Sequence, residues 1–300
     1  MDIQLYLKTK RQLVDRTLGQ LLPSADEYPS IIYEAVRYSV FAGGKRLRPI
    51  LCLAAAEALS GDSVKLLPVA AALELIHTYS LIHDDLPAMD DDDFRRGKPT
   101  CHKQFGEGIA ILAGDALLTL AFEVISNYGL EEGKKDPALG LAVMEVIWEV
   151  ASAAGLRGMI GGQVLDLQAE TVSVSGEELK YIHEHKTGAL FRASIRTGAI
   201  LSGARSEELA ALTAYSENFG LVFQITDDIL DVTGDPAIMG KPVGSDQKNR
   251  KATYPAMYGL AKSRDLARQA VEKACASLSK LPGDTKPLEG IIRYLLERES

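Results

Sequence analysis

The chain has 300 residues, of which 46% are apolar and 25% charged, and its 33 basic and 41 acidic side chains give a formal net charge of −8. This composition excludes a disordered chain, and the acidity disfavours a duplex nucleic-acid binder and a protein held at a membrane surface. We expect no membrane span, because no uncharged apolar run approaches the roughly 18 residues of a span. We expect a cytoplasmic location, because the N-terminus MDIQLYLKTKRQ lacks the apolar core of a signal peptide. The 3 cysteines, which form no disulfide or zinc pattern, agree with that location.

Apolar residues recur at the three- and four-residue intervals of helices along most of the chain. The pattern is strongest over residues 66–86, 108–125 and 212–230. The best candidate for a strand, TVSVS at 171–175, leads into a capping box between Ser175 and Glu178 that predicts a further helix. Expected helix ends are marked by Gly and Pro at 43–44, 61, 97–99, 234–236 and 282–283. Because no linker or repeat divides the chain, we predict one all-α domain over residues 1–300, with roughly ten or more helices around a core or a shared cavity.

Aspartates gather in two short segments, each at the end of an apolar helix. Residues 84–93 read DDLPAMDDDD, with six aspartates in ten positions, and residues 227–231 read DDILD. A charge run is usually a solvated surface. Like charges this close destabilise a helix, however, and at a helix C-terminus they face the negative end of the dipole. We therefore expect divalent cations to compensate them.

The first segment predicts a loop that returns to its own helix. His77 and Asp84 share a helical face, and Pro87 ends the helix so that Asp90 can fold back toward Asp84. Carboxylate ligands without histidine or cysteine select hard cations, and Mg²⁺ binds one or two protein carboxylates together with substrate phosphates. Neither segment has the alternating aspartates, glycine and glutamate of an EF-hand, so we predict Mg²⁺.

The second segment brings its polar side chains onto one face of a helix. Asp227 and Asp231 are four residues apart, and Gln224 and Asp228 belong to the same stripe of positions. These four side chains can therefore converge on one site.

Basic residues accompany both acidic segments. Arg95, Arg96 and Lys98 follow the first one directly. The other basic groups are Lys45, Arg46 and Arg48 after a diglycine turn, Lys186 beside Thr187, and Lys241, Lys248, Arg250 and Lys251 after the second segment. Each group alone describes a solvated face or an ordinary loop, whereas metal ions and arginines in one cavity describe a diphosphate site. Since neither GxxxxGK[ST] nor GxGxxG occurs, a nucleotide-binding fold is not indicated.

These motifs resemble the trans-prenyltransferase (polyprenyl synthetase) family. The resemblance covers nearly the whole chain, through the segments GGKRLRP, LIHDDLPAMDDDDFRRGKPTCH, GDALL, GQVLDL, HKTGAL, FQITDDILD and GKPVGSDQKNRKATYP. It implies an all-α, isoprenoid-synthase-type helical bundle around a deep central cavity, usually homodimeric. It also implies an enzyme that joins isopentenyl diphosphate to an allylic diphosphate.

The resemblance assigns a role to each group of residues in this chain. About three Mg²⁺ ions, which Mn²⁺ can replace, are expected on Asp84, Asp90, Asp227 and Asp231, with Asp85 and Asp228 as further ligands or as support. Contacts to the allylic diphosphate are expected from Arg95, Lys186 and Lys241. Contacts to isopentenyl diphosphate are expected from Gly44, Lys45, Arg48, His77 and Arg96. The catalytic candidates are Arg95 and Lys186, together with Thr187 and Gln224, which are expected to face the developing carbocation.

The implied reaction needs these residue types. Loss of diphosphate leaves an allylic carbocation, and Mg²⁺ with fixed cations stabilises the charge of the departing group. The alkene of isopentenyl diphosphate then attacks, and the released diphosphate can take the proton, so no strong protein base is required. Apolar helical walls keep water from the carbocation. His77 could instead be a core histidine, and we interpret His83 as structural.

Product length is predicted from the helix that carries Asp84. Tyr79 lies one turn and a half earlier, roughly 7.5 Å along the helix axis, where it would form a floor for the growing chain. The small side chain of Ser80, the next residue, would not form such a floor. An aromatic residue here, together with the longer DDLPAMD spacing, resembles the bacterial farnesyl diphosphate synthase branch of the family, so we predict a fifteen-carbon product. The alternative is that Tyr79 only packs between helices.

Several other kinds of protein share part of this pattern. A geranylgeranyl diphosphate synthase would carry the same motifs, usually with a smaller residue in place of Tyr79. A class I terpene cyclase usually has an Asn/Ser/Glu-type second motif and needs no pocket formed by Lys45, Arg48 and His77. A non-catalytic regulatory subunit would be expected to have lost aspartates or their basic partners, which this chain keeps.

Overall fold

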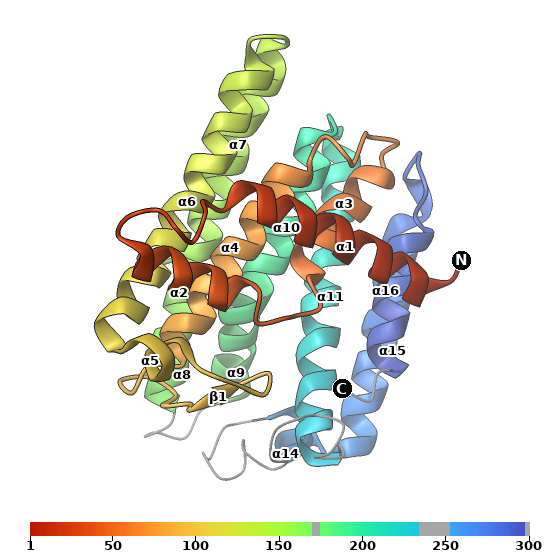
Figure 1. Cartoon of the computed structure of the whole chain (residues 1–300). Helices are drawn as coiled ribbons and strands as arrows, with labels where there is room; N and C mark the ends of the chain where they lie inside the picture. The colour runs from red at the N-terminus through yellow and green to blue at the C-terminus, as the bar shows by residue number, and fades with distance from the viewer. Residues whose placement is uncertain (170–174, 234–252, 298–300) are drawn as a thin grey trace.

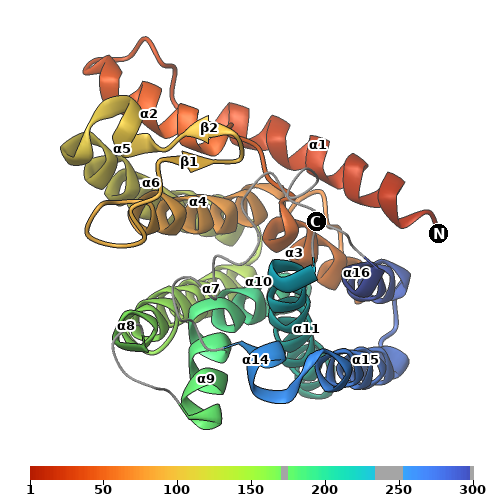
Figure 2. The same ribbon diagram turned by 90° about the horizontal axis from the view of Figure 1, so that it is seen from below.

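The computed structural model describes residues 1–169, 175–233 and 253–297, and these residues form a helical bundle (Figures 1 and 2). In chain order the helices are α1 (Ile3–Leu21), α2 (Ser30–Val40), α3 (Leu47–Glu57), α4 (Leu67–Asp84), α5 (Cys101–Phe105), α6 (Glu107–Gly133), α7 (Pro137–Ala154), α8 (Met159–Ala169), α9 (Gly176–Ile182), α10 (Ala189–Leu201), α11 (Ser206–Thr233), α14 (Tyr254–Tyr258), α15 (Leu260–Ser277) and α16 (Lys286–Glu297). The other elements are the strands β1 (Phe94–Arg95) and β2 (Lys98–Pro99), the π-helix η1 (His183–Gly188) and the 3₁₀-helix η2 (Leu278–Lys280). The predicted all-α class is confirmed.

Helices α4 and α10 form the centre of the bundle. Every residue of α4 from Val69 to Ile76 is buried, as expected for a helix that is apolar around its whole circumference. Helix α4 packs against α6 and α3, and α10 packs against α3, α7 and α11. The rings of Phe191 on α10 and Phe219 on α11 meet edge to face at 5.1 Å. These contacts give the central helices a fixed frame from which polar residues at their ends can project.

Helices α4 and α11 end at the same end of the bundle. Figure 1 shows both reaching its lower end, where β1 and α14 also lie, and Figure 2 looks at this end directly, with both strands of the hairpin in view. The last residue of α4 is Asp84, and the last turn of α11 contains Asp231. The two acidic segments, which are far apart in sequence, therefore approach one region of the molecule.

A two-stranded hairpin follows the first acidic segment. Phe94 pairs with Pro99 and Arg95 with Lys98 in antiparallel register. Between them, Arg96 and Gly97 both have positive φ angles of 54° and 75°, the geometry of a tight two-residue hairpin turn. Helical periodicity did not predict this element, because each strand is only two residues long and shows no alternation.

Most sequence signals for helix ends hold where the structure describes them, but the one at 97–99 is wrong, because these residues belong to the β1–β2 hairpin and α4 already ends at Asp84. Ser175 Oγ accepts a hydrogen bond from the Glu178 amide at 3.2 Å, and a Glu178 carboxylate oxygen accepts one from the Ser175 amide at 2.8 Å, so the predicted capping box is confirmed. The Gly43–Gly44 pair separates α2 from α3, and Gly283 separates η2 from α16. The strand candidate at 171–175, apart from Ser175, and the break at 234–236 lie outside the described residues.

Two stretches of the chain are long and apolar enough to cross a membrane by length and composition alone. They are Glu107–Gly133 and Pro137–Ala169. In the most apolar 18-residue segment of each, 39% and 28% of the residues are buried inside the bundle. Both stretches pack within the fold, α6 against α4 and α7 against α10. Among the residues that the structure describes there is thus no clear membrane span, and the apolar surface that these helices leave exposed needs another explanation.

Candidate active site

The segment after α4 returns to the helix as predicted. The Asp90 amide donates a hydrogen bond to the Asp84 carbonyl at 2.9 Å, and the Asp91 amide donates one to the Leu86 carbonyl at 3.1 Å. Pro87 lies inside this return and cannot extend the helix. Asp84 and Asp90 are therefore held next to each other at the end of α4.

The Asp84 carboxylate lies in a partly buried and highly charged environment. Its pKa is raised to about 6, mainly by burial and also by the charges of Asp90 and Asp85, while Lys186 and Arg95 act in the opposite direction. No hydrogen bond or salt bridge of the described chain engages the side chain of Asp84 or Asp90. Carboxylate oxygens without a hydrogen-bond partner in the described chain are a donor set that fits Mg²⁺, and the two neighbouring basic side chains suit an anion beside it.

Asp85 orients Arg95 through a bidentate ion pair. Arg95 Nε lies 2.7 and 2.9 Å from the two carboxylate oxygens of Asp85, and Nη2 lies 2.6 Å from Oδ1. The Asp85 side chain is only 4% exposed, whereas that of Arg95 is 32% exposed. Burial raises the pKa of Asp85, and the Arg95 charge opposes that shift. Asp85 is thus satisfied by the protein itself and positions the guanidinium toward the open side of the site.

Arg96 lies against the diglycine turn. Its guanidinium donates a hydrogen bond to the Gly43 carbonyl. Gly43 and Gly44 have φ angles of +105° and +134°, and a Cβ atom on Gly44 would lie 2.8 Å from Arg96 Nη1. Two glycines are needed here for both the backbone conformation and the close approach of the arginine. The contact brings the turn and the hairpin, about fifty residues apart in sequence, to one place.

Arg48 and His77 lie beside this contact in buried surroundings. The Arg48 guanidinium is 4.4 Å from the centre of the Phe191 ring, a cation–π contact. Burial lowers the pKa of Arg48 to about 10, and the charge of Arg96 acts in the same direction. Burial, followed by the charges of Arg48, Arg96 and Arg95, lowers the pKa of His77 well below its usual range. The imidazole is therefore neutral, and the mutual repulsion of the arginines favours a bound anion.

Arg46 has a different role from its neighbours. Its side chain is 2% exposed and pairs with Glu74 at 2.9 Å and with Asp15 at 2.8 Å, and it donates a further hydrogen bond to the Val40 carbonyl at 2.7 Å. These partners satisfy the guanidinium and fix the start of α3. Lys45, one residue earlier, is exposed at the rim.

Lys186 and Thr187 lie on the π-helix η1. Lys186 Nζ forms an ion pair with Asp166 of α8. A Cβ atom on Gly162, one turn before Asp166, would lie 2.2 Å from the Lys186 backbone nitrogen, so only glycine permits this packing. Single π-helical turns are frequent at functional sites because they redirect side chains that a regular helix would point elsewhere. Here the turn brings Lys186 close enough to act electrostatically on Asp84.

In the second acidic segment, Asp228 is held by protein donors. Gln224 Nε2 donates to Asp228 Oδ1 at 2.8 Å, and the Tyr254 amide donates to Oδ2 at 2.9 Å. Asp228 is 2% exposed and Asp231 is 3% exposed, whereas Asp227 is exposed. Asp228 therefore supports the site from behind, and Asp227 lies where a ligand can reach it. The predicted phosphate contact Lys241 lies outside the described residues.

Tyr79 is buried one and a half turns before Asp84. It is 6% exposed, its hydroxyl has no hydrogen-bond partner among the described residues, and its ring meets His83 edge to face at 5.7 Å. His83 Nε2 lies 3.0 Å from the Ile111 carbonyl of α6, which agrees with a structural role. Ser80 Oγ donates to the His77 carbonyl at 2.9 Å.

Asp166 lies near the site, and the sequence alone gave it no role. Its segment, GQVLDL, is part of the family resemblance, which assigns Asp166 no individual role. The spacing of Gly162 and Asp166 could have indicated a role in packing. Residues four positions apart share a helical face, and another element can pack against that face. The partner of that face, η1, follows only from the fold.

The chain matches the family model described as polyprenyl synthetase over residues 29–288. The chain belongs to the polyprenyl synthetase family. It is 43% identical over 299 residues to a farnesyl diphosphate synthase of Geobacillus stearothermophilus, covering 100% of this chain and 99% of that protein. It is 44% identical over 296 residues to a geranylgeranyl diphosphate synthase of Cyanophora paradoxa, covering 98% and 96% of the two chains.

Among solved structures, the fold is similar to an FPP/GFPP synthase from Zymomonas mobilis, with a TM-score of 0.85, 38% identity, and coverage of 98% of this chain and 99% of that one. The protein is thus an enzyme of the prenyltransferase class with the all-α isoprenoid synthase fold. Enzymes of this family act on isoprenyl diphosphates and use divalent metal ions. The relatives carry names for products of different length, so the family alone does not identify the product.

Proposed function

We propose that this enzyme is a farnesyl diphosphate synthase, which condenses isopentenyl diphosphate head to tail with dimethylallyl or geranyl diphosphate and releases diphosphate. The observation that carries the proposal is the convergence of Asp84 and Asp90 with Lys186 and Arg95 at one end of the bundle. Two unsatisfied carboxylates beside two oriented cations suit a metal-bound diphosphate.

The metal ions are about three Mg²⁺ per site, held by Asp84, Asp90, Asp227 and Asp231, with Mn²⁺ able to substitute. When bound, they supply positive charge that stabilises the leaving diphosphate. Asp85 and Asp228 support this set, because their oxygens already accept hydrogen bonds from Arg95, Gln224 and the Tyr254 backbone.

Different residues of the chain bind the two substrates. Arg95 and Lys186, with Lys241, bind the allylic diphosphate. Arg48, Arg96 and neutral His77 bind isopentenyl diphosphate beside Gly44 and Lys45, since an anion relieves the mutual repulsion of the two arginines. Thr187 and Gln224 face the developing carbocation. The released diphosphate accepts the final proton, so the protein needs no general base.

Tyr79 determines the product length in this proposal. The growing chain runs from Asp84 along α4 and meets the Tyr79 ring roughly 7.5 Å away. The ring is buried and its hydroxyl has no partner among the described residues, which suits a side chain that ends an apolar tunnel. A geranylgeranyl diphosphate synthase is the second candidate, favoured by the names of several relatives.

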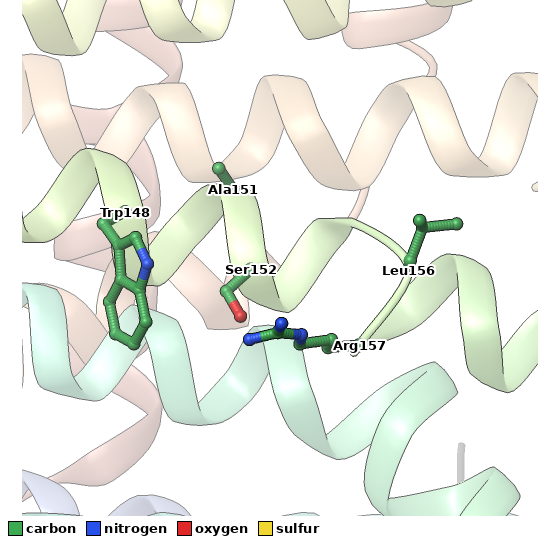
Figure 3. Close-up of a pocket in the computed structure, with 5 residues that line it drawn as sticks. All are labelled: Trp148, Ala151, Ser152, Leu156 and Arg157. Atoms are coloured by element: carbon green, nitrogen blue, oxygen red, sulfur yellow. The ribbon is translucent and has the colours of Figure 1, made fainter.

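A homodimer is the proposed assembly. Helices α6, α7 and α8 expose large apolar side chains, and Figure 3 shows Trp148 and Leu156 at a shallow surface pocket that also includes Arg157. Trp148 is 64% exposed and Leu141 is 73% exposed. Apolar surface on this scale is typical of a surface that a second copy of the chain covers. Light scattering of the purified protein tests this, and a monomer would contradict it.

One assay tests the function. The protein is incubated with isopentenyl and dimethylallyl diphosphates, with and without Mg²⁺, and the products are identified by chromatography. We expect Mg²⁺-dependent formation of a fifteen-carbon product. A twenty-carbon main product would replace the proposal with the second candidate, a cyclised hydrocarbon would indicate a terpene cyclase, and the absence of condensation would favour a regulatory subunit.

The role of Tyr79 has a matched pair of variants. Tyr79→Ala opens the space below the site, so we expect products longer than fifteen carbons. Tyr79→Phe keeps the ring and removes only the unpartnered hydroxyl, so the product length stays unchanged. If Tyr79→Ala makes the same product as the unaltered enzyme, Tyr79 is only a packing residue.

A further inference from the structure

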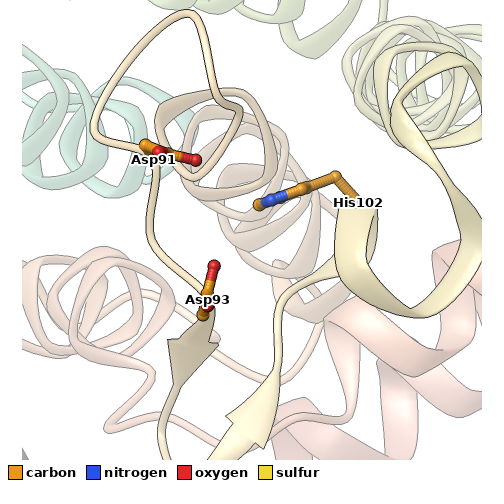
Figure 4. A group of neighbouring side chains, drawn as sticks. All are labelled: Asp91, Asp93 and His102. Atoms are coloured by element: carbon orange, nitrogen blue, oxygen red, sulfur yellow. The ribbon is translucent and has the colours of Figure 1, made fainter.

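Three side chains outside the residues assigned above converge between the acidic loop and α5. Carboxylate oxygens of Asp91 and Asp93 and a ring nitrogen of His102 all lie within 4.8 Å of one another, and Figure 4 shows the imidazole pointing toward both carboxylates. Asp91 and Asp93 precede β1, and His102 belongs to α5, directly after β2. The three residues therefore lie at the open end of the β1–β2 hairpin.

The hydrogen bonds around His102 determine which ring nitrogen carries the hydrogen. Thr100 Oγ1 has one hydrogen, which it donates to the Asp92 carbonyl at 2.8 Å. His102 Nδ1 lies 3.1 Å from the same Oγ1, so Nδ1 must be the donor in this contact. The neutral imidazole then has its lone pair on Nε2.

The Nε2 atom lacks a partner although it is buried. His102 is only 6% exposed, and Nε2 forms no hydrogen bond within the described chain. Because one ring nitrogen lies within 4.8 Å of an oxygen of each carboxylate, a ring lone pair there is repelled by both acids unless a metal cation or a proton lies between. Lys103 Nζ contacts Asp93 Oδ1 at 2.7 Å and compensates one carboxylate from outside, which leaves the other Asp93 oxygen and the Asp91 carboxylate for the interior of the cluster.

We propose that Asp91, Asp93 and His102 form a binding site for a divalent transition-metal ion of the zinc type, separate from the carboxylate-only Mg²⁺ site. An imidazole nitrogen with two carboxylate oxygens suits Zn²⁺ or Co²⁺, whereas Mg²⁺ prefers oxygen ligands alone. Three protein ligands leave room for water to complete the coordination. Thr100 is a positioning residue, because its contact with Nδ1 directs Nε2 toward the ion.

The place of this site in the fold gives it a consequence. Asp93 immediately precedes Phe94 of β1, and His102 follows Pro99 of β2 by three residues. An ion bound by both therefore ties the two ends of the hairpin together. The hairpin carries Arg95 and Arg96, so Zn²⁺ should slow hydrogen exchange of its backbone amides. The binding of the ion does not depend on the proposed synthase activity.

The direct test is nitrogen NMR of the full-length protein with ¹⁵N-labelled histidine. In the metal-free protein we expect one ring-nitrogen signal of Nε2 that is absent in His102→Gln and therefore belongs to His102. Addition of Zn²⁺ in excess Mg²⁺ should shift that signal. A signal that Zn²⁺ leaves in place would overturn the proposal.

Calorimetric titration with Zn²⁺ gives the second measurement. Asp93→Asn changes an exposed side chain, so the fold should persist, and we expect its Zn²⁺ affinity to fall roughly tenfold or more, with a comparable loss for Thr100→Val. The control Asp92→Asn alters the acid between the two proposed ligands, and Asp84→Asn alters the carboxylate-only site; both should keep the affinity. Equal affinity in Asp93→Asn, or loss in Asp84→Asn, would show that Zn²⁺ binds elsewhere.

Discussion

Replacement of Asp84 by asparagine should make the metal-free protein more stable while it impairs metal binding. Asp84 lies at the end of α4 beside Asp90 and Asp85, with a pKa raised from 3.8 to about 6, above all by burial. Its charged form is therefore less favourable in the folded than in the unfolded chain. An asparagine side chain keeps the shape of the aspartate without the charge, so the replacement removes this destabilisation.

The size of the effect follows from the shift in pKa. A difference of about two pH units between folded and unfolded states corresponds to roughly 3 kcal/mol of unfavourable free energy at neutral pH. The Asp84 side chain is partly exposed, and solvent screening reduces the figure. We therefore expect Asp84→Asn to raise the free energy of unfolding by about 1 to 3 kcal/mol at pH 8.

The stabilisation by Asp84→Asn should depend on pH, whereas a change in packing would alter stability equally at every pH. Because the folded pKa of Asp84 is about 6 and the unfolded value is 3.8, the penalty is complete above pH 6 and declines as the pH falls toward 3.8. The advantage of Asp84→Asn should therefore shrink to roughly half at pH 5. The exposed Asp26→Asn variant serves as a control and should show no such trend.

Urea unfolding in EDTA, followed by circular dichroism at one protein concentration, measures these differences. Thermal unfolding with Mg²⁺ and inorganic diphosphate completes the comparison, because a ligand that binds only the folded state raises the melting temperature. The unaltered protein should gain stability from the two additions, and Asp84→Asn should gain much less. A variant that is less stable than the parent in EDTA at pH 8 would refute the reasoning.

Two further predictions concern packing and buried charge. Gly162→Ala places a Cβ 2.2 Å from a backbone nitrogen of η1. We therefore expect the free energy of unfolding in urea to fall by about 1 to 3 kcal/mol and the activity to fall as well. Gly108→Ala, with open space around its Cβ, is the control and should be neutral or slightly stabilising. Glu74→Gln removes the negative charge that lies 2.9 Å from Arg46 in the core. It should lower the free energy of unfolding by roughly 3 kcal/mol, measured in the same way. Asp265→Asn, in an exposed ion pair, should change stability by less than about 1 kcal/mol; similar losses in both would contradict the buried-pair argument.

The sequence could predict whatever depends on short-range periodicity. The apolar pattern at 66–86 became α4, and that at 212–230 lies inside α11. The return of Asp90 to Asp84 followed from Pro87, because a proline limits where the helix can continue. In each case the determining interactions lie within one or two helical turns, so the local residues carry enough information.

Features that depend on contacts between distant segments could not be predicted in this way. The π-helical turn at Lys186 exists where η1 packs against Gly162 of α8, and no local pattern distinguishes it from an ordinary helix. The pairing of Arg46 with Glu74 and Asp15 likewise needs three helices in place. Basic residues that look alike in the GGKRLRP segment thus have different roles, which only the fold separates.

The carboxylates of the site differ in what satisfies them, and this difference indicates their function. Asp85 and Asp166 each pair with a basic residue, and Asp228 accepts hydrogen bonds from Gln224 and the α14 backbone, so these acids hold protein groups in position. Asp84 has no such partner in the described chain, and burial makes its charge unfavourable. A fold gains nothing by keeping an unpaired acid in that environment, unless a cation from outside the chain compensates it. A stability cost of Asp84 in the metal-free protein is therefore what we expect of a carboxylate that the proposal assigns to a metal ion.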